Sequence, residues 1–337
     1  MKETVKIKQW QLIRYSSKKE VVDLSEQAFL SIGKRAFWRR RRLEKLVLPA
    51  GVSAIKTEAF YGCKRLKSVV LSDDCNVGIA ASAFRNCARL SEITHFESVT
   101  SIGKNAFTGC QRLGELALGE DLKSIGETAF RGCTSLETVR LPQSVQTLGK
   151  GAFRDCTELT TVALDASMLA PELFRGCISL YEFELSPLVS EIPRGCFHGC
   201  SALERVVIPS TVKRLKGGSF ADCSRLAEVE MELGVETVGS FAFVNANRLA
   251  RVVLPHSVKR LGFGAFGLGR SRGEKIEITV DNEYMLKRIR RQLFLCGSAG
   301  RASVTFEGKT IEERRRERRR TTLEQTPTHL IDTEEKD

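Results

Sequence analysis

The chain has 337 residues, and its 53 lysines and arginines outnumber its 41 aspartates and glutamates to give a net charge of +12. Hydrophobic residues make up 42% of the sequence, but no apolar run approaches the roughly 18 residues that a membrane-spanning helix needs, which argues against a transmembrane segment. The positive charge permits an acidic partner but does not require one.

Residues 1–31 precede a periodic array and are expected to cap its N-terminal end, because a stack of repeats leaves its core exposed there. Residues 1–15 are basic but contain neither an apolar core nor a small-residue cleavage site, so no secretory signal is predicted. Together with an odd number of cysteines, 11, this favours reduced thiols and a cytoplasmic location. Transport to the cell surface by a non-classical route is the alternative.

A phenylalanine recurs through residues 32–272 at nearly constant spacing, and in eight cases a cysteine follows three positions later. Such periodicity predicts a solenoid of about eleven stacked units and not a globule with one central core. The phenylalanines are Phe37, Phe60, Phe84, Phe107, Phe130, Phe153, Phe174, Phe197, Phe220, Phe243 and Phe266. The cysteines are Cys63, Cys87, Cys110, Cys133, Cys156, Cys177, Cys200 and Cys223.

Each unit, such as residues 122–142, combines two patterns. Near its end, the apolar Val139 and Leu141 alternate with polar residues, which predicts a short strand with one buried face. Such strands would stack about 4.8 Å apart into a parallel sheet on one side of the solenoid. Earlier in the unit, apolar residues such as Phe130 and Cys133 recur every third position. This spacing predicts a short helical turn on the other side of the solenoid.

The pattern V-x-x-I-G-x-x-A-F-x-x-C-x-x-L-x-x-V-x-L-P resembles the BspA-like leucine-rich repeat family. Residues 12–15 and 20–24 also resemble the hairpin that opens such arrays. The resemblance implies an α/β repeat, a right-handed leucine-rich-repeat solenoid with parallel strands on one face and short helical turns on the other. Members of this family are commonly surface-associated binding proteins of host-dwelling bacteria and protists.

The period stops before residues 273–306, which are expected to form a strand–helix–strand cap at the C-terminal end. Residues 275–280 and 302–306 have the composition of strands, and residues 284–295 have an amphipathic helical pattern between them. Residues 307–337 are expected to form a charged helix and a disordered tail, because they are polar all round and lack an apolar stripe.

Two units break the rhythm of the array. The usual spacing between successive phenylalanines is 23 residues. Phe153 and Phe174 are two residues closer than this, and Phe60 and Phe84 are one residue further apart. Irregular units in repeat proteins lie at binding sites or result from neutral changes of loop length, and both interpretations remain open.

No constellation of acid, base and nucleophile accompanies the repeat, so neither an enzyme nor a cofactor site is predicted. Cys196, His198 and Cys200 have the composition of a metal site, but Cys196 takes a slot that other units fill with alanine. Residues two apart also diverge around a helical turn, so no metal site is predicted. The cysteines are interpreted as buried thiols in small apolar slots.

The solvent-facing positions of the predicted strands differ from unit to unit, and a partner-binding surface is expected there. In the second half of the array these positions carry charges of both signs. Either neighbouring charges pair into a salt-bridge ladder, or they form a charged docking strip for a polypeptide. The candidate residues are Thr138, Arg140, Glu182, Glu184, Arg205, Glu228, Glu230 and Arg251.

Arginines recur on the rims of the predicted solenoid and form stripes along it. Such stripes suit an acidic polymer, including nucleic acid, but no nucleic-acid-binding motif is present, and aromatic residues among them are confined to Trp38 beside residues 39–42. The stripe residues are Arg42, Arg65, Arg85, Arg89, Arg112, Arg131, Arg154, Arg175, Arg225 and Arg248.

The sequence therefore predicts a non-catalytic scaffold that binds a protein or peptide through its strand face and rims. Two alternatives remain: a surface adhesin of the BspA-like type, and a binder of nucleic acid or another polyanion through the arginine stripes.

Overall fold

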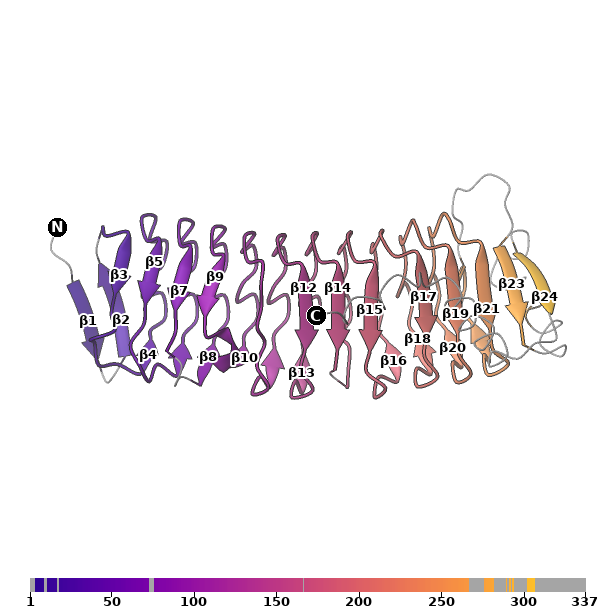
Figure 1. The fold of residues 1–337 in the computed structure, drawn as a ribbon, viewed down its shortest axis with the longest axis horizontal. Helices are drawn as coiled ribbons and strands as arrows, with labels where there is room; N and C mark the ends of the chain where they lie inside the picture. The colour runs from indigo at the N-terminus through magenta and orange to yellow at the C-terminus, as the bar shows by residue number, and fades with distance from the viewer. Residues whose placement is uncertain are drawn as a thin grey trace, which may run out of the picture.

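The computed structural model describes residues 4–8, 11–16, 18–72, 76–165, 167–266, 276–281, 289, 291, 293 and 302–306. These residues form an elongated stack of coils, along which the chain advances from one end to the other (Figure 1). The solenoid of stacked parallel strands that the repeat predicts is confirmed.

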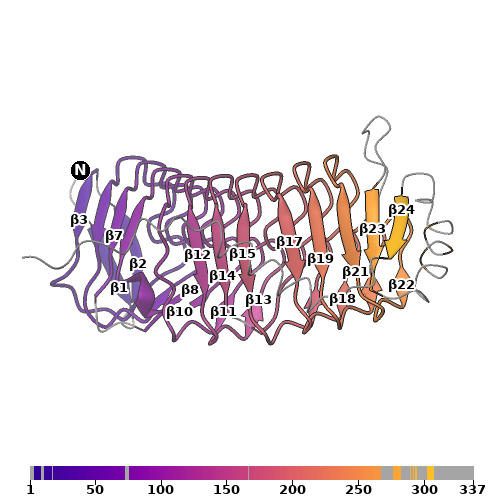
Figure 2. The ribbon, with the colours of Figure 1, turned by 45° about the vertical axis from the view of Figure 1, so that its right-hand side comes forward.

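Each coil of the array contributes up to two strands, and both sets of strands stack along the solenoid (Figure 2). Strands near the ends of units show the predicted alternation in several coils: in β12 (Thr138–Leu141), Val139 and Leu141 are buried whereas Thr138 and Arg140 are exposed. The start of the unit adds a second short strand, such as β11 (Ser124–Ile125), which was not predicted from the sequence.

The first set of strands forms an eight-stranded and a four-stranded sheet. Its members are β1 (Thr4–Lys8), β2 (Gln11–Ser16), β4 (Ser31–Ile32), β6 (Ala54–Ile55), β8 (Val77–Ile79), β10 (Val99–Ile102), β11, β13 (Thr147–Leu148), β16 (Glu191–Ile192), β18 (Arg214–Leu215), β20 (Thr237–Val238) and β22 (Arg260–Leu261).

The second set forms sheets of four, three and five strands. Its members are β3 (Val21–Asp23), β5 (Lys45–Val47), β7 (Ser68–Val70), β9 (Glu92–Thr94), β12, β14 (Thr161–Leu164), β15 (Glu182–Leu185), β17 (Arg205–Ile208), β19 (Glu228–Met231), β21 (Arg251–Leu254), β23 (Ile276–Val280) and β24 (Ala302–Phe306).

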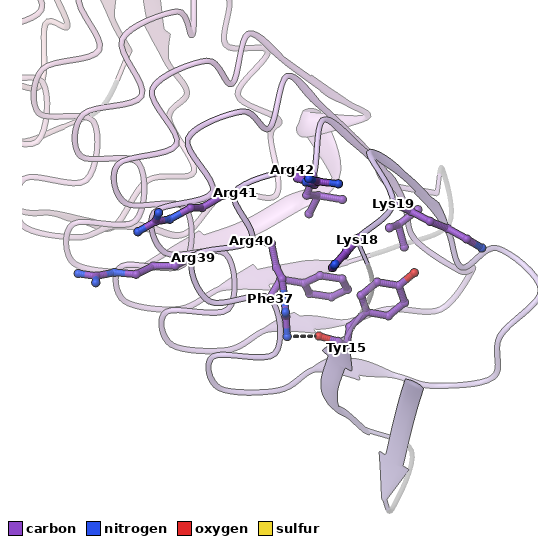
Figure 3. Close-up of a pocket in the computed structure, with 10 residues that line it drawn as sticks. Tyr15, Lys18, Lys19, Phe37, Arg39, Arg40, Arg41 and Arg42 are labelled. Atoms are coloured by element: carbon purple, nitrogen blue, oxygen red, sulfur yellow. Dashed lines mark hydrogen bonds between the residues drawn. The ribbon is translucent and has the colours of Figure 1, made fainter. Parts of the chain in front are cut away.

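The repeated phenylalanines form a column of stacked rings inside the solenoid. The rings of Phe107 and Phe130, for example, have centroids 5.2 Å apart and planes inclined by only 2°. Tyr15 adds a first ring at the N-terminal end, 5.0 Å from Phe37 (Figure 3). Because buried aromatic rings combine a large apolar area with favourable ring contacts, this column is the centre of the core.

The repeated cysteines line the same core and are free thiols, as predicted. Each of the eight thiols donates to the carbonyl oxygen of the phenylalanine in the preceding coil; Cys63 Sγ lies 3.0 Å from the Phe37 oxygen. Burial raises the pKa of Cys110 and of Cys223 to about 12. The thiolate forms are therefore disfavoured, and these cysteines are packing residues.

The phenylalanine side of each coil is not helical, which corrects the predicted helical turns. In one such turn, the Phe60 N–H donates a hydrogen bond to the carbonyl oxygen of Ala83 in the next coil. The Cys63 N–H instead donates to the carbonyl oxygen of Phe60 in its own turn. The residues two before and two after the phenylalanine, Glu58 and Gly62, have φ values of 57° and 69°. Left-handed residues at this spacing interrupt a right-handed helix, so the step of three comes from consecutive tight turns.

The ends of the stack differ from its middle. At the N-terminus, β1 and β2 form an antiparallel hairpin, and β2 pairs in parallel with β4. At the other end, β23 and β24 extend the sheet beyond β21 in parallel. Most of the helix predicted over residues 284–295, and all of residues 307–337, lie outside the described residues.

Helical structure is scarce in the part of the array that the structure describes. Between residues 32 and 266 its single helical segment is the 3-10 helix η1 (Phe96–Ser98), which follows a left-handed residue, His95. Among all described residues, no helix is both long and apolar enough to cross a bilayer.

Candidate functional site

The eight residues predicted to bind a partner, the charged strip, lie on the second set of strands but are divided between two sheets. Thr138 and Arg140 lie on β12. Glu182 and Glu184 occupy the corresponding positions on β15, with β14 between. The remaining residues lie on β17, β19 and β21, which belong to the next sheet: Arg205, Glu228, Glu230 and Arg251.

On β17 to β21 the charges pair with one another. Arg205 lies 3.5 Å from the Glu228 carboxylate and 3.0 Å from that of Glu230. Arg251 lies 3.8 Å from Glu228. Glu230 is only 5% exposed, so Arg205 compensates a carboxylate that is largely removed from water. In this sheet the charges form a salt-bridge ladder, one of the two arrangements that the sequence left open.

On β15 the carboxylates are not compensated in this way. Glu182 and Glu184 are exposed, and neither forms an ion pair with any residue that the structure describes. Arg140, on β12, is instead engaged by Asp165, with 2.9 Å between Nε and Oδ2. The outer face of β15 therefore presents two negative charges that are available to a partner.

The sheet is interrupted directly beside β15. β15 pairs with β14, and β17 pairs with β19, but β15 and β17 are not hydrogen-bonded to each other. Both ribbon views show a wider spacing at this point (Figures 1 and 2). An open cleft of about 460 Å³ lies there, the β15–β17 cleft. It is lined by Tyr181, Glu182, Phe183, Arg205, Val206 and Val207.

We attribute the interruption to Phe183. This residue takes the inward position that valine fills on the flanking strands, and its ring packs 4.4 Å from that of Phe197. In the coils of β15 and β17, the rings of Phe174 and Phe197 are 5.7 Å apart. A phenyl ring needs more space than an isopropyl group, so it holds adjacent coils apart.

The walls of the cleft combine apolar and charged side chains. Tyr181 is 55% exposed and Val207 is 40% exposed, so both present apolar surface at the cleft. The backbone edges of β15 and β17 face the cleft without a strand partner. Unpaired strand edges are templates for pairing with an added strand, so the site is suited to an extended polypeptide.

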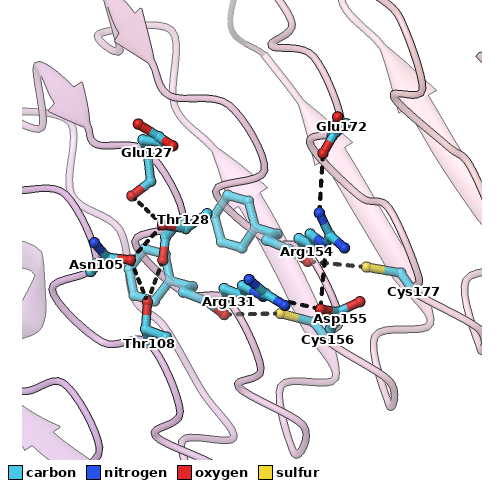
Figure 4. A network of polar contacts seen from close by, with 12 residues as sticks. Asn105, Thr108, Glu127, Thr128, Arg131, Arg154, Asp155, Cys156, Glu172 and Cys177 are labelled. Atoms are coloured by element: carbon cyan, nitrogen blue, oxygen red, sulfur yellow. Dashed lines mark hydrogen bonds and ion pairs between the residues drawn. The ribbon is translucent and has the colours of Figure 1, made fainter.

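The rim arginines are in part neutralised by carboxylates of neighbouring coils (Figure 4). Arg131 Nε lies 3.1 Å from Asp155, and Arg154 Nη1 lies 3.2 Å from Glu172. Burial raises the pKa of Glu172, but a hydrogen bond from Lys150 and the nearby arginines outweigh this and hold its pKa below the ordinary value. Glu172 is therefore ionised at neutral pH and compensates the arginine.

The same network contains neutral contacts between coils. The Asn105 side-chain oxygen accepts hydrogen bonds from Thr128 at 2.6 Å and from Thr108 at 3.3 Å (Figure 4). Further along the stripes, Arg65 and Arg225 pair with Glu44 and Glu204, respectively. These contacts tie successive coils together, and they reduce the positive charge available to a polyanion.

The cluster of Cys196, His198 and Cys200 does not converge on a metal site. Both thiols are buried, and burial raises their pKa well above the ordinary value. His198 instead lies 3.0 Å from Asp222. Among the described residues, no group of three or more histidines, cysteines and carboxylates is placed to hold a metal ion.

Sequence analysis missed the apolar part of the site, although Tyr181, Phe183 and Val207 stand beside the predicted charges. A signal was present: Phe183 replaces an aliphatic residue in the strand pattern, and it follows the unit that is two residues short. The sequence thus located the region through Glu182, Glu184 and Arg205 but not the cleft.

Comparison with known proteins identifies relatives of the repeat. The family described as "BspA type Leucine rich repeat region (6 copies)" matches residues 77–169 and 166–270, more than half of the chain. A search of the curated proteins found no match.

One solved structure has a similar fold, and two further leucine-rich repeat proteins are weaker matches. A leucine-rich repeat protein from Bacteroides ovatus is 21% identical to this chain, with a TM-score of 0.56. The alignment covers 90% of this chain and 98% of the other. A leucine-rich repeat protein of T. pallidum has 30% identity over 60% of this chain and 87% of its own, with a TM-score of 0.43. A leucine-rich cell surface protein from Faecalibacterium prausnitzii has 21% identity over 72% of this chain and 89% of its own, with a TM-score of 0.35.

Proposed function

The chain belongs to the BspA-type leucine-rich repeat family, and from this premise we propose that it is a non-catalytic scaffold that binds an extended protein or peptide segment in the β15–β17 cleft. Leucine-rich repeat proteins generally offer rigid, extended surfaces for binding. The observation that carries the proposal is the pair of unpaired strand edges that face one cleft.

The side chains around the cleft define the chemistry of the bound segment. A segment that pairs with β15 places alternate side chains beside Glu182 and Glu184, where lysine or arginine is favoured. The intervening side chains turn toward Phe183 and Val206, where apolar groups are favoured. The proposed partner is therefore an extended segment with alternating basic and apolar residues.

The other candidate functions have weaker support. A polyanion binder would use the rim arginines, several of which already pair with carboxylates, as Arg131 does with Asp155. Catalysis has no support in a constellation of acid, base and nucleophile among the described residues. The cytoplasmic location stays a prediction. Recovery of the protein on the surface of intact native cells would contradict it and favour the adhesin alternative.

A labelled peptide tests the proposed site directly. We expect the peptide Lys-Val-Lys-Val-Lys-Val to bind the full chain, as measured by fluorescence anisotropy at low salt. The double variant Glu182→Gln/Glu184→Gln should bind it about three- to tenfold more weakly, because two exposed charge pairs are lost. The matched control, Glu92→Gln/Glu115→Gln, removes two exposed carboxylates elsewhere and should leave the affinity unchanged.

A second peptide tests whether the backbone takes part. Lys-Val-Lys-Pro-Lys-Val keeps the three charges but lacks one N–H, and we expect it to bind much more weakly because proline interrupts strand pairing. Equal affinity for both peptides, or an equal loss in both double variants, would show that binding is electrostatic only, and the proposal would fail.

A further inference from the structure

A pocket of about 230 Å³ lies at the N-terminal end of the solenoid, far along the chain from the β15–β17 cleft (Figure 3). Its lining includes Lys18, Lys19 and four consecutive arginines, residues 39–42, together with the rings of Tyr15 and Phe37. We call it the N-terminal pocket. It lies outside the charged strip, and nothing in the proposed function uses it.

The pocket arises from one exception to the repeat. Phe37 is followed three residues later by Arg40, where the next coils carry a cysteine. The Arg40 guanidinium donates to the carbonyl oxygen of Tyr15, just as the Cys63 thiol donates to that of Phe37 (Figure 3). Arg40 therefore takes the cysteine's place in the ladder and brings a permanent positive charge to the end of the core.

The Arg40 side chain is not fully satisfied by this contact. Its Nε is buried and has no hydrogen-bond partner among the residues that the structure describes. A guanidinium has five N–H donors, and buried donors without acceptors are costly. An acceptor supplied from outside the chain would reduce this cost.

Three further cations of the pocket are not neutralised by described carboxylates either. Lys18, Arg41 and Arg42 form no ion pair with any described carboxylate, and Arg39 stacks on Trp38 with 4.5 Å between its guanidinium carbon and the ring centroid. In this respect the pocket differs from stripe residues such as Arg65 and Arg131, which carboxylates of neighbouring coils compensate.

Among the acidic residues near the pocket in sequence, Glu20 is exposed and does not line the pocket, and Glu44 and Asp23 are engaged elsewhere. Glu44 pairs with Arg65 and with Lys67, and the hydrogen bond from Lys67 lowers its pKa. Asp23 accepts the Ser25 N–H at 2.9 Å, and this hydrogen bond lowers its pKa. Both carboxylates are thus ionised at neutral pH but committed to other partners, which leaves the pocket with a local excess of positive charge.

We propose that the N-terminal pocket binds a tetrahedral oxyanion, the phosphate or sulfate group of a small anionic ligand. Arginine forks match the geometry of such groups and bind them through charge-assisted hydrogen bonds. Confinement in a cavity strengthens these contacts relative to the same charges on an open surface. The volume of about 230 Å³ accommodates a group of this size with part of its carrier.

Isothermal titration of the full chain with sodium pyrophosphate and, separately, with sodium sulfate tests the proposal at constant ionic strength. We expect binding that the variant Lys18→Gln/Arg42→Gln weakens about tenfold or more, because two charge-assisted contacts are lost. The matched control, Arg89→Gln/Arg112→Gln, removes the same charge from exposed positions further along the stack and should change the affinity less than about twofold.

A third variant separates binding from folding. Arg40→Cys restores the thiol found in the next coils, so we expect it to keep the thermal stability of the wild type and to lose oxyanion binding. Binding of pyrophosphate alone assigns a phosphoryl ligand, and binding of both anions assigns oxyanions in general. Absence of binding at millimolar anion, equal weakening in both double variants, or undiminished binding by Arg40→Cys would overturn the proposal.

Discussion

The coils of β12 and β14 and the junction between β15 and β17 are built from the same repeat but differ at one inward position. β12 and β14 pair with Val139 opposite Val162, and the phenylalanines of their coils, Phe130 and Phe153, have ring centroids 5.1 Å apart. At the junction, the rings of Phe174 and Phe197 are 5.7 Å apart, and Phe183 enters where the flanking strand β14 has Val162. The paired strands β12 and β14 carry valine at this position, and the strand beside the cleft carries phenylalanine.

Under the proposed function, this difference is how the repeat gains a site without losing its fold. Stacked coils tolerate a local change because each coil contacts mainly its neighbours. The regular coils supply stability, and the irregular junction supplies unpaired edges and exposed side chains. The predictions that follow test this division of roles by altering one region at a time.

The largest effect is expected in the regular column. Phe107→Ala removes a fully buried ring that stacks on both neighbours, and we expect it to lower the free energy of unfolding by about 3–5 kcal/mol. Urea denaturation followed by circular dichroism measures this loss. The control is Phe263→Ala, which removes a ring that is 61% exposed and should cost far less. Similar losses in both variants would show that the column does not dominate stability.

The thiols of the regular coils predict a loss of stability at alkaline pH. An unfolded cysteine has a pKa near 9.0, whereas burial raises the pKa of Cys110 to about 12. The stabilisation by the neutral thiol is complete below pH 9 and is lost as the pH rises from 9 to 12, at about 1.4 kcal/mol per pH unit for each such thiol.

Urea denaturation at pH 8, 9 and 10 measures this slope. Cys110→Ala is the matched variant, and it should show a shallower loss than the wild type because one titrating thiol is absent. Identical slopes for the two proteins would mean that Cys110 ionises with an ordinary pKa in the folded state.

The regular part of the fold was predictable from the sequence because residue type and spacing determine it. The phenylalanine column and the buried face of strands such as β12 follow from periodicity alone. The prediction of helical turns was wrong because apolar residues at every third position fit both a helical turn and consecutive tight turns. The distinguishing signal was Gly62, Asn86 and Asp155, residues that tolerate positive φ, two places after the phenylalanine.

The sites were less predictable because they depend on volumes and not on patterns. The charges of Glu182 and Glu184 were visible on the strand, but pairing with Arg205 was equally consistent with the sequence. Phe183 in an aliphatic position preserves the hydrophobic pattern, so its effect on strand separation emerges only in three dimensions. Arg40 was visible as a missing cysteine after Phe37, but its contact with the Tyr15 carbonyl was not.

The smallest effect on stability, and the sharpest test of the comparison, is expected from Phe183→Val. This change gives β15 the inward residue that β14 and β17 already have at this position. We expect the junction to become regular, with β15 and β17 paired. The free energy of unfolding should change by less than about 1 kcal/mol, because new backbone hydrogen bonds offset the lost ring contacts.

Hydrogen exchange and peptide binding report the two consequences of Phe183→Val separately. Amide protons of β17 should exchange more slowly in the variant, since pairing with β15 protects them. The Lys-Val-Lys-Val-Lys-Val peptide should lose its affinity, although Glu182 and Glu184 remain in place, because no strand edge is left to pair with it. Val139→Ile also alters the size of an apolar side chain at the inward position, but on β12, and it should alter neither measurement. If the variant retains full affinity with protected β17 amides, the peptide binds by charge alone, and the unpaired edges are not the site.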